Sequence, residues 1–217
     1  MGSSARSTDW QSLVDLIYTE EVDDPCALLR EVFRLYRRVS NFSSAVFLPV
    51  DAATGALRPG ASVDHDPELI AEYLEHYLLL DPYMINGPTP ATMNRVFVFT
   101  EVAAGVPDFR GSGFPDFMRK LPYADALAVL VATSARPLGV VSVHRKAHMA
   151  AFSDRDIHDF GWLTRHLAKG LDLRERAANV GPQAGAGLLV VDAAGNILWL
   201  NGLARRIVNE ARIEPRA

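Results

Sequence analysis

The sequence predicts an α+β domain, in which an antiparallel sheet carries helices on both faces and a long helix closes the fold. Two apolar, β-prone runs over residues 125–133 and 138–145 flank a short polar turn, which is typical of a buried hairpin. An amphipathic segment over residues 153–173 follows at helical periodicity. The chain of 217 residues is long enough for one full domain and part of another.

Two helices are expected at the start of the chain. The first is short and belongs to an N-terminal extension over residues 1–23. Its apolar face recurs at helical spacing: Trp10, Leu13, Val14 and Ile17. Asp24 then provides an N-cap, and Pro25 suits the first position of a helix. A second helix is therefore expected from Pro25 to Val39, where its apolar pattern ends.

A hairpin and a third helix are expected next. Residues 42–50 are β-prone, residues 51–55 form a turn with a terminal glycine, and a weaker strand follows over residues 56–63. The third helix begins after Asp66 and ends near Leu80, because the following aspartate precedes a proline and is disfavoured in helical geometry.

Over residues 86–121 we expect loops that alternate with short regular elements. Residues 86–91 form a loop, and residues 95–100 are an aromatic strand. Residues 103–113 are rich in glycine and proline, which predicts a mobile loop that could gate a binding site. Residues 115–121 form one or two helical turns.

The closing helix begins at a capping-box variant, in which Ser153 is followed by Asp156 three residues later. We assign residues 24–178 to the main domain and residues 179–187 to a linker. Residues 188–217 then form a strand, a turn, a strand and the start of a helix, too short to bury a core of their own.

Composition excludes several classes of function. The net charge of −4, without a basic block, argues against nucleic-acid binding by this chain. A single cysteine, Cys26, excludes an intramolecular disulfide and a cysteine-rich metal site. The longest apolar run, residues 126–132, is strand-sized, and residues 1–8 lack the hydrophobic core of a signal peptide. We therefore expect a cytoplasmic protein that does not contact membranes.

Catalytic and metal motifs are not found in the sequence. The histidines lack carboxylate companions at ligand spacing, and His144 and His148 flank a strand end, so their side chains need not converge. The chain contains no G-x-S-x-G motif and no phosphate-binding glycine loop between a strand and a helix. We therefore expect no enzyme, no catalytic residue, no metal site and no cofactor.

The combination of EYLEHYLLLDPY at residues 72–83, a strand ending at Arg145 and the pair Phe152-Ser153 resembles a known family. It resembles the GAF-like N-terminal sensory domain of bacterial LuxR-type transcriptional regulators. This resemblance implies a six-stranded antiparallel sheet, a ligand pocket on one face of it, and a homodimer. Residues 188–217 resemble the start of a PAS domain. DNA contact is implied only for a C-terminal helix-turn-helix domain that is absent from this chain.

Some features depart from better-known relatives within this resemblance. In acyl-homoserine-lactone sensors a tryptophan aligns near Tyr73, and the interval corresponding to Tyr77–Asp81 is longer, which argues against lactone recognition here. The chromophore cysteine of phytochrome-type GAF domains is missing, and the motif of cyclic-nucleotide GAF domains is not visible.

The candidate ligand site combines apolar walls with a few polar anchors, as small-molecule pockets usually do. Asp81 and Arg145 are the candidate anchors. The candidate wall residues are Tyr73, Tyr77, Tyr83, Phe97, Phe99, Phe117, Met118 and Tyr123. Each of these residues also has a purely structural explanation, its plain alternative: core packing for the aromatic residues, helix capping for Asp81, and an outward salt bridge for Arg145.

The function implied is that of a sensory domain that binds an unidentified small-molecule effector and forms a homodimer within a LuxR-type regulator. Two alternatives remain open. One is a ligand-free dimerisation scaffold that uses the helices at residues 10–17 and 157–173. The other is the sensor module of a different signalling protein, such as a histidine kinase.

Overall fold

The computed structural model describes residues 3–18, 24–133, 136–180, 189–191, 195, 197–200, 204 and 206–208. The linker was predicted over residues 179–187; residues 179–180 are the end of α7, and residues 181–187 lie outside the described residues, as does most of the predicted C-terminal helix. The division of the chain into domains at residues 24–178 and 188–217 stays a prediction.

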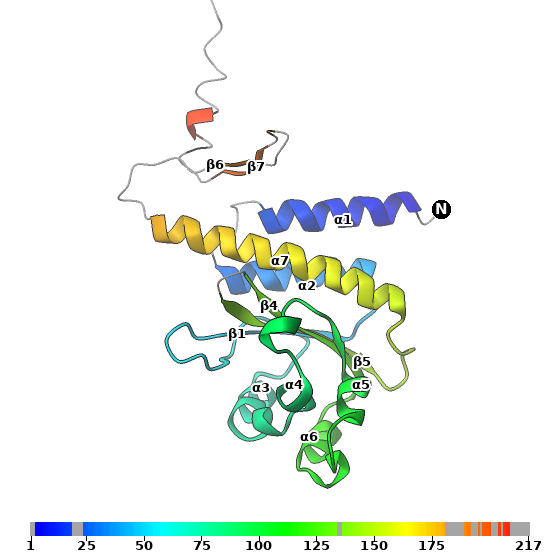
Figure 1. Cartoon of the computed structure of the whole chain (residues 1–217). Coiled ribbons are helices and arrows are strands. Elements are labelled where there is room, and N and C mark those ends of the chain that lie inside the picture. The colour runs from blue at the N-terminus through cyan, green and yellow to red at the C-terminus, as the bar shows by residue number, and fades with distance from the viewer. Residues whose placement is uncertain are drawn as a thin grey trace, which may run out of the picture.

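A five-stranded antiparallel sheet forms the centre of the molecule, which confirms the predicted α+β class (Figure 1). The strand order is β2-β1-β5-β4-β3. The strands are β1 (Ser44–Pro49), β2 (Ser62–Val63), β3 (Phe97–Val98), β4 (Tyr123–Ala132) and β5 (Pro137–Lys146). Within the described residues this sheet has one strand fewer than the resemblance implies. The predicted strand over residues 56–63 is reduced to β2, because Pro59 and Gly60 interrupt it.

Register fixes which side chains share a face of the sheet. Val129 on β4 pairs with Val141 on β5, and Phe47 on β1 pairs with the same Val141. Because side chains alternate along a strand, these residues point to one face and their sequence neighbours to the other. The first face carries the main core, which includes the fully buried Leu127 and Val143.

Two helices cover that first face, α2 (Pro25–Val39) and α7 (Asp154–Val180), and α1 (Ser3–Tyr18) packs on both of them as an outer layer (Figure 1). The predicted start of α2 is confirmed, since the Asp24 carboxylate accepts hydrogen bonds from the backbone N–H groups of Cys26 and Ala27. Both α1 and α7 extend beyond their predicted bounds, α7 as far as Val180.

The apolar faces of α1 and α7 are buried in the core of the chain itself. Leu13 and Ile17 of α1 are 0% and 1% exposed, and Phe160 and Leu167 of α7 are fully buried in the same core. These faces therefore give no separate support to the scaffold alternative, which relied on them for dimerisation.

Short helices cover the other face of the sheet (Figure 1). They are α3 (Pro67–Glu72), a π-helical turn (Tyr73–Tyr77), a 3₁₀ turn (Leu78–Leu80), α4 (Pro82–Asn86), α5 (Phe99–Ala104) and α6 (Phe114–Lys120). The end of the third predicted helix at Leu80 is confirmed. A new helix, α4, follows at once, because the aspartate that ends one helix caps the next.

On this face, one predicted strand is much shorter than expected, and one predicted loop is interrupted by helical turns. The predicted strand over residues 95–100 is reduced to β3, and the chain becomes helical at Phe99. The predicted loop over residues 103–113 contains the end of α5 and a 3₁₀ turn (Phe109–Gly111). The aromatic ring of Phe109 packs on those of Phe99 and Phe114, which explains why this glycine-rich segment is structured.

Beyond α7, β6 (Leu189–Val191) pairs with β7 (Ile197–Leu200) as an antiparallel hairpin, as the sequence predicts. Among the described residues, no helix combines the length and the hydropathy that crossing a membrane requires.

Candidate functional site

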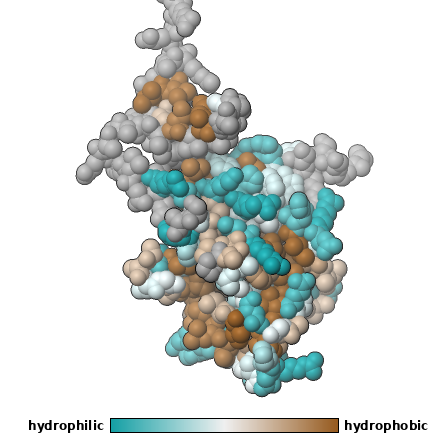
Figure 2. All heavy atoms as spheres, viewed as in Figure 1, coloured by the Kyte–Doolittle hydropathy of each residue, from teal (hydrophilic) through white to brown (hydrophobic). Residues whose placement is uncertain are grey.

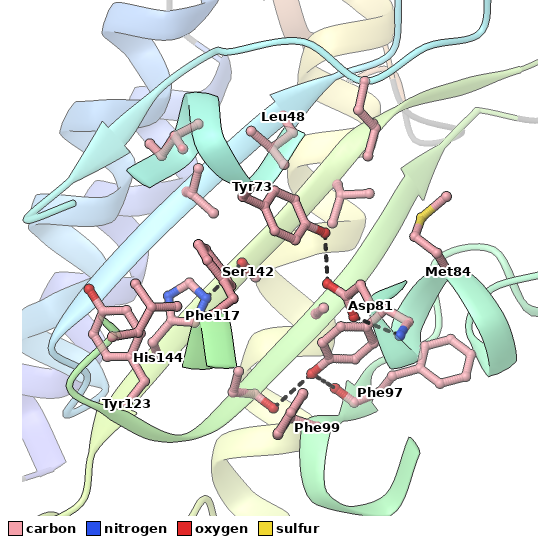
Figure 3. Close-up of a pocket in the computed structure, with 18 of the residues that line it drawn as sticks. Leu48, Tyr73, Asp81, Met84, Phe97, Phe99, Phe117, Tyr123, Ser142 and His144 are labelled. Carbon is pink, nitrogen blue, oxygen red and sulfur yellow. Dashed lines mark hydrogen bonds between the residues drawn. The ribbon is translucent and has the colours of Figure 1, made fainter. Parts of the chain in front are cut away.

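A cavity of about 120 Å³ lies between the sheet and the short helices (Figure 3). For comparison, an apolar protein cavity of about 150 Å³ holds one benzene molecule. The cavity therefore matches a small ring in size. Its walls are mainly aliphatic and aromatic, and a few polar groups project into it.

The sheet provides the floor of the cavity. Ala126 and Ala128 of β4 and Val140 and Ser142 of β5 line it, whereas alternate residues such as Val141 pack on the opposite face. Space remains above these positions because their side chains are small. The alternation of the two longest strands thus separates a packed core from a cavity.

Eight of the ten candidate site residues line the cavity. They are Tyr73, Asp81, Tyr83, Phe97, Phe99, Phe117, Met118 and Tyr123. Tyr77 is not among the lining residues. Its ring stacks on that of Phe117 at 4.7 Å between centroids, and the Lys120 ammonium lies 5.7 Å from its centroid. Tyr77 therefore supports the aromatic wall from behind.

Arg145, the second candidate anchor, lies away from the cavity. Its side chain is buried on the opposite face of the sheet, where it donates hydrogen bonds to the backbone carbonyls of Asn41 (2.6 Å), Ala150 (3.2 Å) and Ala151 (2.8 Å). It also forms a salt bridge with Asp156 at 3.1 Å. The alternation of β5 explains this position, because residue 145 falls on the core face. The salt bridge is buried, not outward as the plain alternative held.

Asp81 is the centre of a hydrogen-bonded group at one end of the cavity (Figure 3). The Tyr73 hydroxyl donates to its Oδ2 at 2.7 Å, and the backbone N–H of Tyr83 donates to its Oδ1 at 2.8 Å. The Tyr83 hydroxyl donates to the backbone carbonyl of Ala126 at 3.0 Å, which ties α4 to β4. Asp81 is thus a helix cap, as its plain alternative held, and also a wall of the cavity.

Burial raises the pKa of Asp81 to about 6, although the hydrogen bonds from Tyr73 and Tyr83 act in the opposite direction. Burial and the neighbouring Asp81 also raise the pKa of the Tyr73 hydroxyl well above its ordinary value. Asp81 is therefore mainly ionised at pH 7, and both of its hydrogen-bond donors are neutral. Each carboxylate oxygen keeps a lone pair that can accept a further donor.

A local widening of the helix places Tyr73 for this contact. The chain from Tyr73 to Tyr77 forms a π-helical turn before the 3₁₀ turn that leads to Asp81. Such π-turns occur frequently at functional sites, because they change which side chains share a face of a helix. The sequence shows only a Tyr-rich helix here, so the π-turn was not predicted.

A second polar group at the cavity was missed by the sequence reasoning. His144 Nε2 lies 3.2 Å from Ser142 Oγ, and His144 Nδ1 lies 3.1 Å from His65 Nε2. The ring of Tyr123 stacks on that of His144, with 4.9 Å between centroids. Period-two alternation from Val140 could have placed Ser142 and His144 on the cavity face.

Burial lowers the pKa of His65 to about 4 and that of His144 well below its ordinary value. Both imidazoles are therefore neutral at pH 7. From the sequence, His144 was considered only beside His148, with no reason for the two to converge, and His148 does not line the cavity. Within the part of the chain that the structure describes, no group of three or more His, Cys, Asp and Glu side chains is placed to hold a metal ion.

Comparison with known proteins identifies the fold. No family model and no curated protein matches the sequence. Among solved structures, the VqsR LBD domain from Pseudomonas aeruginosa is 14% identical with a TM-score of 0.56, over 80% of this chain and 98% of that one. The GAF domain of an Acinetobacter phosphoenolpyruvate-protein phosphotransferase is 12% identical with a TM-score of 0.55, over 82% and 99%.

An enzyme has the same architecture. The free methionine-R-sulfoxide reductase from Neisseria meningitidis, solved with its substrate, is 14% identical with a TM-score of 0.54, over 82% of this chain and 96% of that one. The chain therefore has a GAF-like fold. At these identities the likeness establishes the fold alone.

Proposed function

We propose that this chain is the ligand-sensing domain of a bacterial LuxR-type transcription regulator, and that its cavity binds a small, mainly apolar effector with a hydrogen-bond donor. The observation that carries the proposal is a largely apolar cavity into which one buried carboxylate, Asp81, projects with neutral partners. A buried polar group of this kind fixes the orientation of a ligand more than its affinity.

Two further observations support this assignment. The fold is shared with the VqsR LBD domain over nearly the whole of that domain. The Tyr-rich helix that ends in Asp81-Pro82 is the element that the sequence resemblance to LuxR-type regulators rests on, and it supplies Tyr73 and Asp81 to the cavity. DNA contact is proposed only for a domain outside this chain.

An apolar rim suggests how a ligand enters. Met84 lines the cavity and is 47% exposed, and its neighbours Leu79 and Ile85 are 80% and 48% exposed. Figure 2 shows hydrophobic surface on the side of the molecule where α3 and α4 lie. We expect entry beside α4. Residues 103–113, the predicted gate, do not line the cavity.

The readout is proposed to pass through the sheet to α7. Ala126 and Ala128 line the cavity, and Leu127 between them belongs to the core on which α7 packs. A ligand that binds two arrangements of β4 with different affinity would shift the equilibrium between them and move α7. Helix α7 leads into the C-terminal part of the chain, so it is the natural output element.

A catalytic role has less support than binding. The Ser142–His144 contact resembles a nucleophile–base pair, but burial lowers the pKa of His144 and makes it a weak base. Strand β5 is paired on both sides, with β1 and β4, so its N–H groups do not form an oxyanion hole. Cys26, the single cysteine, lies on α2 across the sheet.

Homodimerisation belongs to the same proposal and is tested by the native mass of the purified chain. A dimer mass agrees with it, and a monomer mass across micromolar concentrations contradicts it for this chain. The ligand proposal is independent of that result.

Saturation-transfer NMR with phenol, indole, benzamide and cyclohexanol tests the ligand proposal, and Ala128→Leu is the matched variant. Leucine at position 128 projects from the floor into the cavity, so we expect transfer to at least one probe in the wild type and loss of that transfer in the variant. Equal transfer to both proteins, or none to the wild type at millimolar probe, would refute the proposal.

A further inference from the structure

The cavity has polar groups at two opposite sides. Figure 3 shows Asp81 and Met84 on one side, and His144 and Tyr123 on the other, with the aromatic wall between them. The first side is the carboxylate group described above. The second side is built on β5, where Ser142 and His144 both line the cavity.

The second side is held rigidly. The Tyr123 ring stacks on that of His144, and the ring of His65 meets both edge-on, with 4.8 Å between the centroids of the two imidazoles. These contacts fix the plane of the His144 ring, so its two nitrogens lie along a line from His65 to Ser142. A group held in this way needs little reordering when a ligand arrives.

Counting protons shows that Ser142 retains hydrogen-bonding capacity. A neutral imidazole has one N–H and one lone pair. If His144 Nε2 carries the proton, Ser142 accepts it and its own hydroxyl hydrogen can reach a ligand. If Nδ1 carries the proton, Ser142 donates to Nε2 and its lone pairs can accept from a ligand. In either arrangement the Ser142 hydroxyl can form one more hydrogen bond, to a ligand in the cavity.

We propose that Ser142 is a second ligand anchor, positioned by His144 and His65, and that the effector carries two hydrogen-bonding groups at opposite ends of a small ring. The group at the Asp81 end is a donor, such as a phenolic hydroxyl, because that carboxylate accepts. The group at the Ser142 end is a hydroxyl or another group that matches a serine. This inference rests on the proposed function and adds the chemical class of the ligand.

Two isosteric probes test it. 4-Hydroxybenzyl alcohol and 4-ethylphenol have the same shape and differ in one terminal group, a hydroxyl in the first and a methyl in the second. Their dissociation constants are measured by NMR titration in the wild type, in Ser142→Ala, and in Ser44→Ala. The Ser44→Ala variant is the matched control, because Ser44 Oγ contacts the same His144 at 3.2 Å but does not line the cavity.

We expect Ser142→Ala to shift the ratio of the two dissociation constants about five- to tenfold against the alcohol, as the loss of one hydrogen bond predicts. Ser44→Ala should change the ratio less than twofold. Ser142→Cys, which keeps the size and has a weak donor, should fall between the wild type and alanine, and it serves as the test if the alanine variant does not fold.

An unchanged ratio in Ser142→Ala would overturn the inference, and so would an equal change in Ser44→Ala. Absence of binding by both probes at millimolar concentration would overturn this ligand class. That outcome leaves the proposed function standing if one of phenol, indole, benzamide and cyclohexanol binds in the cavity. Failure of all six probes refutes both.

Discussion

At the scale of single residues, Asp81 combines two roles that are usually separate. It caps α4 through the backbone N–H of Tyr83, and it is a buried carboxylate at a cavity. The sequence identified it from its position before Pro82, which predicts a cap. Its burial could not be predicted, because burial follows from the way α4 returns over β4.

Burial of Asp81 makes stability depend on pH in an unusual direction. Its folded pKa of about 6 lies above the ordinary value of 3.8, so between about pH 4 and pH 6 the folded state binds more protons than the unfolded state. The free energy of unfolding therefore falls as the pH rises through this window, by about 2 to 3 kcal/mol from this group.

Asp81→Asn should abolish that dependence and retain the cap. Urea unfolding at pH 4 to 7 provides the measurement, and Asp66→Asn is the control, because Asp66 caps α3 in the same way at an exposed position. Burial of His65 and His144 acts in the opposite direction in all three proteins, so the difference from the wild type is the informative quantity. We expect the unfolding free energy of the wild type minus that of Asp81→Asn to fall by about 2 to 3 kcal/mol through this window, and the same difference for Asp66→Asn to stay constant. Identical slopes in all three proteins would contradict the buried-carboxylate account.

Arg145 illustrates a residue that was identified by sequence and reassigned by structure. Its guanidinium lies 4.0 Å from the centre of the Phe152 ring, in addition to its carbonyl and Asp156 contacts. Loss of a buried cation that holds three carbonyls and a carboxylate leaves these acceptors unpaired, so Arg145→Met should lower the free energy of unfolding by about 3 kcal/mol.

The control for Arg145 is Arg155→Met, which removes the contact of an exposed arginine with the half-buried Asp159 at 3.8 Å and should cost under about 1 kcal/mol. Equilibrium urea unfolding measures both. Because Arg145 does not line the cavity, a folded Arg145→Met protein should bind probes as the wild type does. A change of less than about 1 kcal/mol for Arg145→Met would argue against its structural role.

At the scale of elements, the contact between α1 and α7 depends on a glycine. A Cβ at Gly170 of α7 would lie 2.5 Å from Cγ2 of Ile17 and 3.0 Å from its backbone oxygen. Alanine normally stabilises a helix interior by about 1 kcal/mol relative to glycine. Here it should instead force α1 outward and lower stability by about 1 to 3 kcal/mol.

Gly161→Ala on the same helix is the comparison for Gly170→Ala. Its Cβ would meet only one methyl group, Cγ2 of Val96, at 3.2 Å, a contact that a shift of a few tenths of an ångström relieves. Thermal unfolding should therefore separate the two variants by several degrees, with Gly170→Ala the less stable. Equal midpoints would show that α1 does not pack on α7 as described.

The secondary-structure elements differ in how well the sequence predicts them. The helices α2 and α7 and the strands β4 and β5 were predictable, because caps and apolar periodicity specify them locally. The segments over residues 73–113 were not predictable. Their helices are short and show little periodicity, and they are stabilised by contacts with the sheet that the local sequence does not reveal. Seven of the cavity-lining residues come from those segments, among them Tyr73, Asp81 and Phe99, so their residue types were predictable but their conformations were not.

At the scale of the whole molecule, the two faces of the sheet differ in packing. One face is a dense core, and the other leaves a cavity above small side chains. Ala128→Leu should therefore fill space and raise the free energy of unfolding by about 1 kcal/mol. Ala45→Leu, at a fully buried position on the core face, should lower it by about 1 to 3 kcal/mol. Urea unfolding that ranks the two variants in the opposite order would contradict this assignment of the faces.

The central claim is that the cavity binds a small molecule, and methyl NMR during a phenol titration tests it most directly. Leu48 and Val140 line the cavity, whereas Val141 and Val143 on the neighbouring positions of the same sheet face the core. We expect saturable chemical-shift changes at the first pair and much smaller changes at the second. No change with phenol, indole, benzamide or cyclohexanol at millimolar concentration, or equal changes on both faces, would contradict a ligand site in the cavity.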